Sequence, residues 1–198
     1  MNLFENDKII LPLSDGIFEY YPSFFNSEKA NELFYLLKKD ITWQQDSITL
    51  FGKTHLQPRL TALYGNNGKS YKYSNVVMHP KNFTPLLTHI KEEIEAICHE
   101  NFTTVLLNLY RDGNDSNGWH SDNEKELGRD PIIASLSLGE ERSFHIKNNT
   151  KEEKFKLNLE PGSLLLMKQG SQVHYKHQIP KTQLSKKPRI NLTFRTIL

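Results

Sequence analysis

His120, Ser121 and Asp122 place an imidazole and a carboxylate two positions apart in the chain. On a β-strand, residues two apart share a face, so these two side chains can approach one metal ion. Two histidines and one carboxylate, with open positions opposite, are the ligand set that holds non-haem Fe(II). A His-x-Asp pair alone is weak, because a surface strand end with a capping aspartate has the same pattern. The pair predicts a metal site only if a second histidine joins it.

Three histidines downstream of the pair could supply the remaining ligand: His145, His174 and His177. His145 alternates with apolar residues, so its side chain could face either side of a strand. His174 and His177 are three apart, and one could bind the metal while the other packs beside it or donates to a neighbouring acceptor. The spacing does not choose among the three.

The C-terminal segment carries Arg189 and Arg195, with Asn191 and Thr193 between them. All four share one face if this segment is a strand, because side chains alternate with a period of two. That face could lie in water as the polar side of an amphipathic strand. It could instead line a cavity, where the planar fork of an arginine binds a carboxylate through two hydrogen bonds.

Asn108 and Tyr110 are also two apart, shortly before the His-x-Asp pair. If their face and the polar face of the C-terminal strand line the same interior, the cavity can hold a dianion at both ends. 2-Oxoglutarate suits this arrangement, since one carboxylate and the keto oxygen bind iron while the protein holds the distal carboxylate. The residues therefore favour an iron enzyme that uses 2-oxoglutarate and dioxygen.

The composition is typical of a globular protein. The chain has 198 residues, of which 37% are hydrophobic and 24% charged, with a formal net charge of +2. We expect one domain over 1–198. The net charge does not by itself indicate a nucleic-acid binder, although it leaves room for a local basic face.

Three further features bear on location. No apolar run reaches the roughly 18 residues that a membrane span needs. The first residues lack the pattern of a signal peptide. Cys98 is the only cysteine, which fits a reducing compartment. We expect a monomer without a membrane partner that is cytoplasmic, or nuclear in a eukaryote.

Two segments are predicted to be helices and most of the rest short strands. One helix begins at Asn26-Ser27 and one at Thr84-Pro85, each with apolar residues at helical spacing. The expected strands are 105–110, 132–138, 143–147, 155–159, 164–167 and 189–197, with a type II turn at Pro161-Gly162. Helices followed by many strands predict an α+β fold, a double-stranded β-helix (jelly-roll) core with supporting N-terminal helices.

Six motifs follow one another along the chain: NLYRDG at 108–113, HSDNE at 120–124, IASLSLG at 133–139, GSLLLM at 162–167, HQIP at 177–180 and RINLTFR at 189–195. Together they resemble the AlkB family of Fe(II)- and 2-oxoglutarate-dependent dioxygenases, and the resemblance extends from about Thr49 to Leu198. It implies that His177 is the third iron ligand. It also implies a 2-oxoglutarate site made of Asn108, Tyr110, Arg189, Asn191 and Arg195.

The resemblance implies an activity as well. Family members oxidise N-alkyl groups on nucleic-acid bases. The expected reaction removes the methyl group of 1-methyladenine and 3-methylcytosine in DNA as formaldehyde, while 2-oxoglutarate becomes succinate and carbon dioxide. The base must first leave its stack, which costs a few kcal/mol. The same chemistry on RNA or on a protein side chain is one alternative, and a non-catalytic jelly-roll binding module is another.

The double-stranded-DNA branch of the family is the most similar in the N-terminal half. The substrate residues that this likeness implies are Phe51, Arg59, Tyr71, Tyr73 and Glu124. Phe51 resembles a hairpin tip that enters the base stack of a duplex, and Arg59 is expected to contact phosphate. The tyrosines resemble a lid segment that touches the flipped base, and Glu124 occupies the base-reading position. About 1–100 would then supply helices and a nucleotide-recognition lid, and about 101–198 the catalytic jelly roll.

Overall fold

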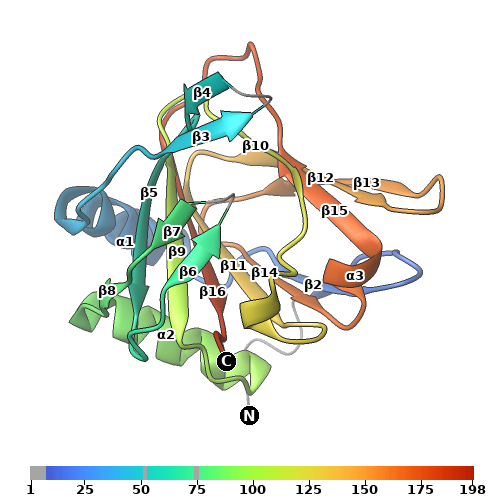
Figure 1. Ribbon diagram of the computed structural model, residues 1–198, viewed down its shortest axis with the longest axis horizontal. Coiled ribbons are helices and arrows are strands. Elements are labelled where there is room, and N and C mark those ends of the chain that lie inside the picture. The colour runs from blue at the N-terminus through green and yellow to red at the C-terminus, as the bar shows by residue number, and fades with distance from the viewer. Residues whose placement is uncertain (1–7, 51–52, 74–75) are drawn as a thin grey trace.

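The computed structural model describes residues 8–50, 53–73 and 76–198, without the side chains of 48–53 and 71–77. Two β-sheets pack face to face, and the expected α+β jelly-roll core is confirmed (Figure 1). The eight-stranded sheet has the order β1 (Ile9–Ile10), β2 (Ile17–Tyr21), β14 (Leu164–Lys168), β11 (Ile133–Gly139), β16 (Arg189–Arg195), β9 (Thr104–Tyr110), β5 (Leu60–Gly65) and β8 (Lys81–Asn82). The four-stranded sheet has the order β10 (Asn117–His120), β15 (Tyr175–Ile179), β12 (Arg142–Asn148) and β13 (Lys154–Leu159).

Two hairpins and four helical segments complete the described elements. The hairpins are β3 (Ser47–Leu50) with β4 (Lys53–Leu56), and β6 (Tyr71–Tyr73) with β7 (Val76–Met78). The helices are α1 (Ser27–Asp40), α2 (Pro85–Cys98), the 3-10 turn η1 (Lys125–Leu127) and α3 (Ser171–His174). None of the described helices has the length and apolar character needed to cross a membrane.

Both long helices begin where their capping residues predict. The side chain of Asn26 accepts from the backbone N–H of Lys29, and that of Thr84 accepts from Leu87 with Pro85 at the first helical position. Each cap satisfies an N–H group that the helix itself leaves without a partner. The apolar stripes of the two helices face the large sheet, on the side away from β12 and β13 (Figure 1).

Alternation along β16 separates two environments. Ile190, Leu192 and Phe194 join the core between the large sheet and the helices. Residues 189, 191, 193 and 195 point the other way, toward the small sheet, and they are buried as well. The polar face of the last strand is therefore not in water. It lies in the interior between the two sheets.

The first hundred residues share the large sheet with the C-terminal half. β2 pairs with β14, and β5 pairs with β9, so N-terminal strands extend the sheet on both sides of its centre. Strands from the first hundred residues thus complete the same sheet as the strands of 101–198. The short strands at 9–21 and 60–65 were not predicted, because they do not alternate clearly between apolar and polar residues.

The turn at Pro161-Gly162 packs against the start of α1. Gly162 has φ of 82°, and its carbonyl accepts from the backbone N–H of Phe25. A Cβ atom at this position would lie 2.3 Å from the carbonyl oxygen of Phe25. The site therefore needs glycine both for its left-handed backbone and for the close approach of the chain.

We expect Gly162→Ala to lower the free energy of unfolding by about 2–4 kcal/mol, combining the left-handed penalty with the cost of forcing an extra methyl group into a packed site. Gly68→Ala is the matched control, because Gly68 has φ of 65° and no atom lies within 4 Å of the place that the new methyl group would take. Its free energy of unfolding should fall only by the penalty for the left-handed backbone, about 1–2 kcal/mol. Urea unfolding measures both, and equal losses would show that the Phe25 contact does not matter.

Candidate metal and co-substrate site

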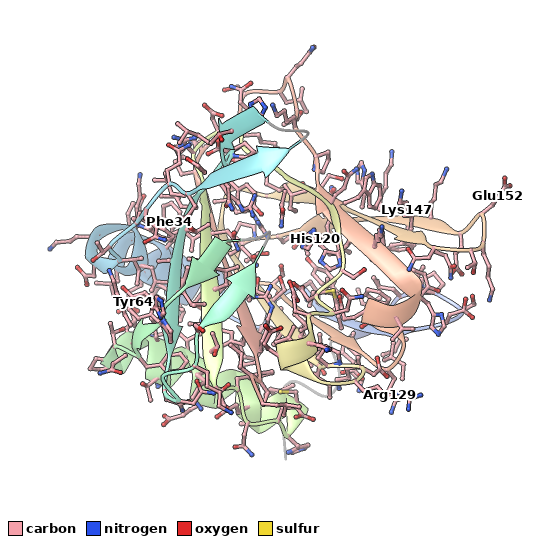
Figure 2. All side chains as sticks on the ribbon, in the orientation of Figure 1. Phe34, Tyr64, His120, Arg129, Lys147 and Glu152 are labelled. Carbon is pink, nitrogen blue, oxygen red and sulfur yellow. The ribbon has the colours of Figure 1, made fainter. Side chains whose placement is uncertain are left out.

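His120, Asp122 and His177 come together between the two sheets. Their ligand atoms all lie within 4.8 Å of one another, and Nε2 of His177 is 3.6 Å from Oδ2 of Asp122. Figure 2 shows His120 near the middle of the molecule. His145 and His174 are not part of this group. The structure thus brings His177, and neither alternative, to the His-x-Asp pair.

Strand pairing explains why residues 57 apart in sequence meet here. His120 ends β10 and is the register partner of His177 on β15. Asp122 lies beyond the strand, so alternation along one strand does not account for the pair, contrary to the sequence argument. The loop after β10 turns Asp122 inward instead. The backbone N–H of Asp122 donates to Oε1 of Gln172, and Ser121 Oγ donates to the carbonyl of Tyr175.

The two histidines are prepared to bind a metal as neutral rings. Burial lowers the pKa of His177 to about 3, with the neighbouring His120 adding to the effect. Burial also lowers the pKa of His120, against the attraction of Asp122. Nδ1 of His120 lies 2.8 Å from the Gly118 carbonyl, a contact that places the ring proton there and makes Nε2, which lies 3.2 Å from Asn117 Nδ2, the unprotonated nitrogen that can bind a metal.

Asp122 is ionised despite its burial. Burial alone would raise the pKa of Asp122, but the charge of Arg195 and the two histidines hold it at about 2. Nη2 of Arg195 donates to Oδ1 of Asp122 at 2.6 Å. Two neutral imidazoles and one carboxylate are the protonation states that metal binding requires.

Arg189 lies at the other end of the polar face of β16. Its Nη2 donates to Ser137 Oγ at 2.8 Å, and the guanidinium lies 5.2 Å from the ring centroid of Tyr110. Nε and Nη1 are buried without a hydrogen-bond partner among the described residues. Burial lowers the pKa of Arg189 to about 10, so the side chain stays charged at neutral pH. A buried cation with two unused donors is costly unless an anion joins it.

Asn108 and Asn191 face each other between the arginines as cross-strand partners. Asn191 Nδ2 donates to Ser135 Oγ, and Thr193 Oγ1 donates to Asn191 Oδ1. A cavity that is partly open to solvent joins the histidine end to the arginine end. Its lining includes Asn108, Tyr110, Asn117, His120, Asp122, Ser135, Phe144, His177, Arg189, Asn191, Thr193 and Arg195.

Comparisons with known proteins agree with this geometry. Residues 18–195 match the family model of the 2OG-Fe(II) oxygenase superfamily. The chain is 40% identical over 187 residues to human alpha-ketoglutarate-dependent dioxygenase alkB homolog 3, covering 89% of this chain and 65% of that protein. It is 34% identical over 196 residues to human DNA oxidative demethylase ALKBH2, covering 93% and 75%. The chain belongs to the AlkB family.

The matches differ in how much of each protein they cover and in sequence identity. The chain spans 64% of bovine alkB homolog 3 and 65% of the human protein, so less than two thirds of either. The solved structure of OsALKBH1 covers 95% of this chain with a TM-score of 0.65 at 16% identity. That likeness bears on the fold alone.

The matching superfamily is one of Fe(II) oxygenases that use 2-oxoglutarate. The residues present fit both. The facial group of two neutral histidines and one carboxylate suits Fe(II) with open positions opposite. The two unused donors of Arg189 fit the distal carboxylate of 2-oxoglutarate, since an arginine fork binds a carboxylate bidentately.

Arg59 does not occupy the place expected for a phosphate contact. Its side chain is buried, with Nε donating to Asn108 Oδ1 at 2.8 Å and Nη1 donating to the Ser116 carbonyl. The expectation is corrected, because a guanidinium held inside the protein does not reach a DNA backbone. Arg59 instead fixes the amide of Asn108 in the cavity wall.

The other residues expected at the substrate are placed only in part. Glu124 is half-buried at the start of η1, two residues after Asp122, and is not among the residues that line the cavity. Tyr71 and Tyr73 lie on β6, in a hairpin separate from the eight-stranded and the four-stranded sheet, and their side chains are not described. Phe51 lies outside the described residues.

Several contributors were missed by the sequence argument. Ser135 and Ser137 support Asn191 and Arg189, and Gln172 holds the backbone of Asp122. The two serines had a usable signal, since they break an otherwise apolar buried strand at alternate positions. Gln172 had none, because it lies on a four-residue helix whose position depends on tertiary contacts.

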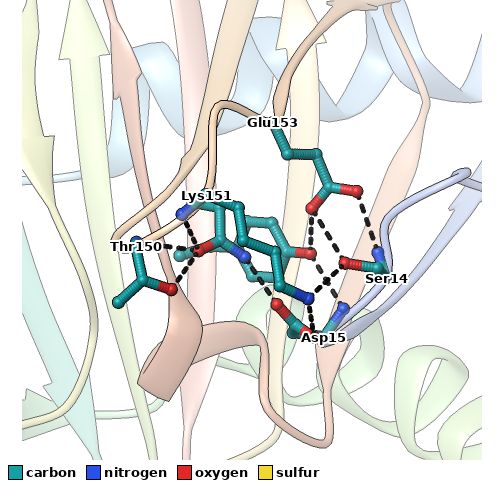
Figure 3. A network of polar contacts seen from close by, with 7 residues as sticks. Ser14, Asp15, Thr150, Lys151 and Glu153 are labelled. Carbon is teal, nitrogen blue, oxygen red and sulfur yellow. Dashed lines mark hydrogen bonds and ion pairs between the residues drawn. The ribbon is translucent and has the colours of Figure 1, made fainter.

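A second polar network holds the start of β15 in place (Figure 3). The hydroxyl of Tyr175 accepts from the backbone N–H of Asp15 and donates to Glu153, while Lys151 pairs with Asp15 at 2.6 Å. Tyr175 is fully buried, and its carbonyl receives the hydroxyl of Ser121. The strand that carries His177 is thus anchored to both the N-terminal segment and the tip of the β12–β13 hairpin.

We expect His177→Ala to weaken Fe(II) binding by more than the roughly 10–100-fold that loss of an outer-shell partner costs, because one of three protein ligands is removed. His174→Ala is the matched control and should change the affinity little. Anaerobic calorimetry with Fe(II) measures both. Retention of iron by His177→Ala together with its loss by His174→Ala would mean that the ligand is assigned wrongly.

Arg189→Ala should raise the dissociation constant for 2-oxoglutarate by about 10–100-fold, the equivalent of one charged hydrogen-bonding contact of roughly 1.5–3 kcal/mol. Fe(II) affinity should stay the same, because Arg189 does not contact the ligand group. The exposed Arg129 provides the control, Arg129→Ala. Titration of 2-oxoglutarate into the iron-loaded protein decides the point, and an unchanged constant would remove Arg189 from the site.

Proposed function

We propose that this protein is a DNA oxidative demethylase that removes the N-methyl groups of 1-methyladenine and 3-methylcytosine. The observation that carries the proposal is a single cavity with His120, Asp122 and His177 at one end and the unused donors of Arg189 at the other. One relative at 34% identity is itself named a DNA oxidative demethylase. That name supports DNA as the substrate class for this chain.

Fe(II) bound by the three ligands supplies the oxygen-activating chemistry. The reaction consumes 2-oxoglutarate and dioxygen, with one oxygen atom entering succinate and the other the methyl carbon, and releases carbon dioxide. The resulting N-hydroxymethyl group loses its hydroxyl proton as its C–N bond breaks, so that formaldehyde leaves and the ring nitrogen keeps the electron pair of that bond. Cleavage of this kind needs no further oxidant.

The chain's own residues do the positioning in this scheme. Arg189 binds the distal carboxylate of 2-oxoglutarate, and Asn108 and Tyr110 line the wall beside it. Arg195 keeps Asp122 ionised and oriented through the 2.6 Å contact. Buried Phe144 and Met167 make part of the lining apolar, which limits the access of water to the reacting carbon.

The decisive experiment measures formaldehyde release from 1-methyladenine in single-stranded DNA, duplex DNA and RNA of one sequence, with and without 2-oxoglutarate. Release from DNA that depends on 2-oxoglutarate and is absent in His177→Ala supports the proposal. Release from RNA alone would replace DNA as the substrate, and no release from any of the three would reject demethylation.

The duplex-to-single-strand ratio of kcat/KM, compared between wild type and Phe51→Ala, tests whether Phe51 enters the base stack of a duplex.

Glu124 is proposed to read the exocyclic amino group of the base. Glu124→Ala should then lower formaldehyde release from methylated DNA by about tenfold or more, the loss of roughly one charged hydrogen bond. Consumption of 2-oxoglutarate in the absence of DNA should continue at the wild-type rate. Equal losses in the two assays would instead assign Glu124 to support of the iron site through the nearby Asp122.

A further inference from the structure

The outward face of the small sheet is strongly basic. Alternate residues of β12, β13 and β15 point away from the iron site, and they include Lys147, Lys154, Lys156 and Lys176, here called the lysine face. Three of these lysines are exposed and Lys147 is half-buried. The outward positions of these strands and of β10 carry no aspartate or glutamate.

Three of the lysines form a row across the sheet. Lys147 is the register partner of Lys154 on one side and of Lys176 on the other. Like charges directly opposite one another destabilise a sheet. Within the part of the chain that the structure describes, no ion pair joins a lysine of this face to a carboxylate. The row carries an uncompensated cost in the protein alone, which an anionic partner would remove.

The next row across the sheet keeps the same sign. His145 lies between Lys156 on β13 and Gln178 on β15. Burial and the charge of Lys156 both lower the pKa of His145. The positive potential therefore extends beyond one row, over an area that includes no acidic side chain on the strands themselves.

Trp119 extends the lysine face to β10, the strand that ends at the metal ligand His120. Trp119 directly precedes His120 in the chain, and the residue is 39% exposed. Nζ of Lys147 lies 4.5 Å from the centroid of this ring. Figure 2 shows Lys147 on the small sheet, on the β13 side of His120. From β10 to β13 is three interstrand spacings, roughly 14 Å.

Protection of a sheet edge does not explain this arrangement. Lysines on an exposed edge strand prevent pairing with other chains, and β13 is such a strand. Lys147 and Lys176, however, lie on β12 and β15, which are paired on both sides. An exposed tryptophan beside them serves no purpose in preventing aggregation.

We propose that the lysine face and Trp119 bind the single-stranded DNA that flanks the target base. The inference rests on the proposed function and adds a second contact surface outside the cavity. Phosphates neutralise the lysine row, and an unpaired base stacks on Trp119, a combination typical of surfaces that bind single strands. A base within a duplex is already stacked and offers no free face to the indole.

The first test replaces the row with Lys147→Gln, Lys154→Gln and Lys176→Gln together. The control, Lys29→Gln, Lys39→Gln and Lys81→Gln, removes the same charge from α1 and β8 on the opposite side of the molecule (Figure 1). The probe is a fluorescent, unmethylated, single-stranded oligonucleotide of about 15 nucleotides, near the upper site size of a single-strand-binding module.

The row variant should bind this probe about tenfold or more weakly, and the slope of log K against log salt should fall by roughly 2, since each lost phosphate contact on a single strand removes about 0.7. The control should match wild type both in its affinity for the probe and in its salt slope. Equal behaviour of the two variants would overturn the proposal, and a loss confined to a duplex probe would overturn the assignment to a single strand.

A second measurement locates the contact without altering the lysines. Trp43→Phe leaves Trp119 as the only tryptophan of the chain. Binding of the oligonucleotide should then quench the remaining tryptophan fluorescence, and in the row variant the same quenching should need about tenfold more oligonucleotide. Binding with undiminished fluorescence would place the strand elsewhere and overturn the contact with Trp119.

Catalysis separates this inference from the proposed function. A methylated trinucleotide can present its target base to the cavity but is too short to cover the face, so kcat/KM for it should be equal in the row variant and wild type. For a methylated strand of about 15 nucleotides, the row variant should lose about tenfold. Absence of formaldehyde from both substrates would reject the demethylase function and leave the binding result intact, whereas equal rates on the long strand would reject the face.

Discussion

The site depends on one buried ion pair, between Arg195 on the last strand and Asp122 in the loop after β10. Both side chains are almost fully buried, and the pair joins the large sheet to the small one across the interior. Removing one partner of such a pair leaves an uncompensated charge and costs about 3–5 kcal/mol. The same contact sets the ionisation of Asp122 and its direction. The same interaction therefore holds the two sheets together and prepares Asp122 to bind a metal.

This constraint also explains the polarity of β16. A buried strand face would ordinarily be apolar, but Arg189, Asn191, Thr193 and Arg195 all lie between the sheets. The neighbouring strand β11 supplies hydroxyl partners at the same level, Ser137 for Arg189 and Ser135 for Asn191. The donors of Arg189 that remain unused face the cavity. The polar layer is therefore complete except where a dicarboxylate would fit.

The sequence predicts the central elements well because they obey local rules. Both helices start at their caps, and the period-two pattern of 189–195 separates the helix-facing residues from the cavity-facing ones. The pattern alone could not decide whether the polar face of this strand lies in water or lines a cavity, since arginine occurs in both places. The ligand residues were predicted, but the reason for Asp122 was wrong, because a turn and not a strand orients it.

The remaining features arise from contacts between distant parts of the chain. Arg59 is buried by its contact with Asn108, which lies 49 residues away in the sequence. Nothing in the sequence around Arg59 distinguishes it from a surface arginine. β10 and β15 are short and lack clear alternation, so their pairing, which brings the two histidines together, could not be anticipated. The residue types therefore indicated the chemistry, while tertiary contacts decided which of the histidines and arginines lie at the site.

The position of β10 has a kinetic consequence. It is an edge strand paired only with β15, and its register shifts between Asn117 and His120. Edges of this kind open locally at a lower free energy than the whole fold. Because β10 ends at His120, each such opening withdraws one ligand while the other strands stay paired. We therefore expect fraying of this edge to limit the lifetime of bound metal, so that metal exchange is faster than global unfolding.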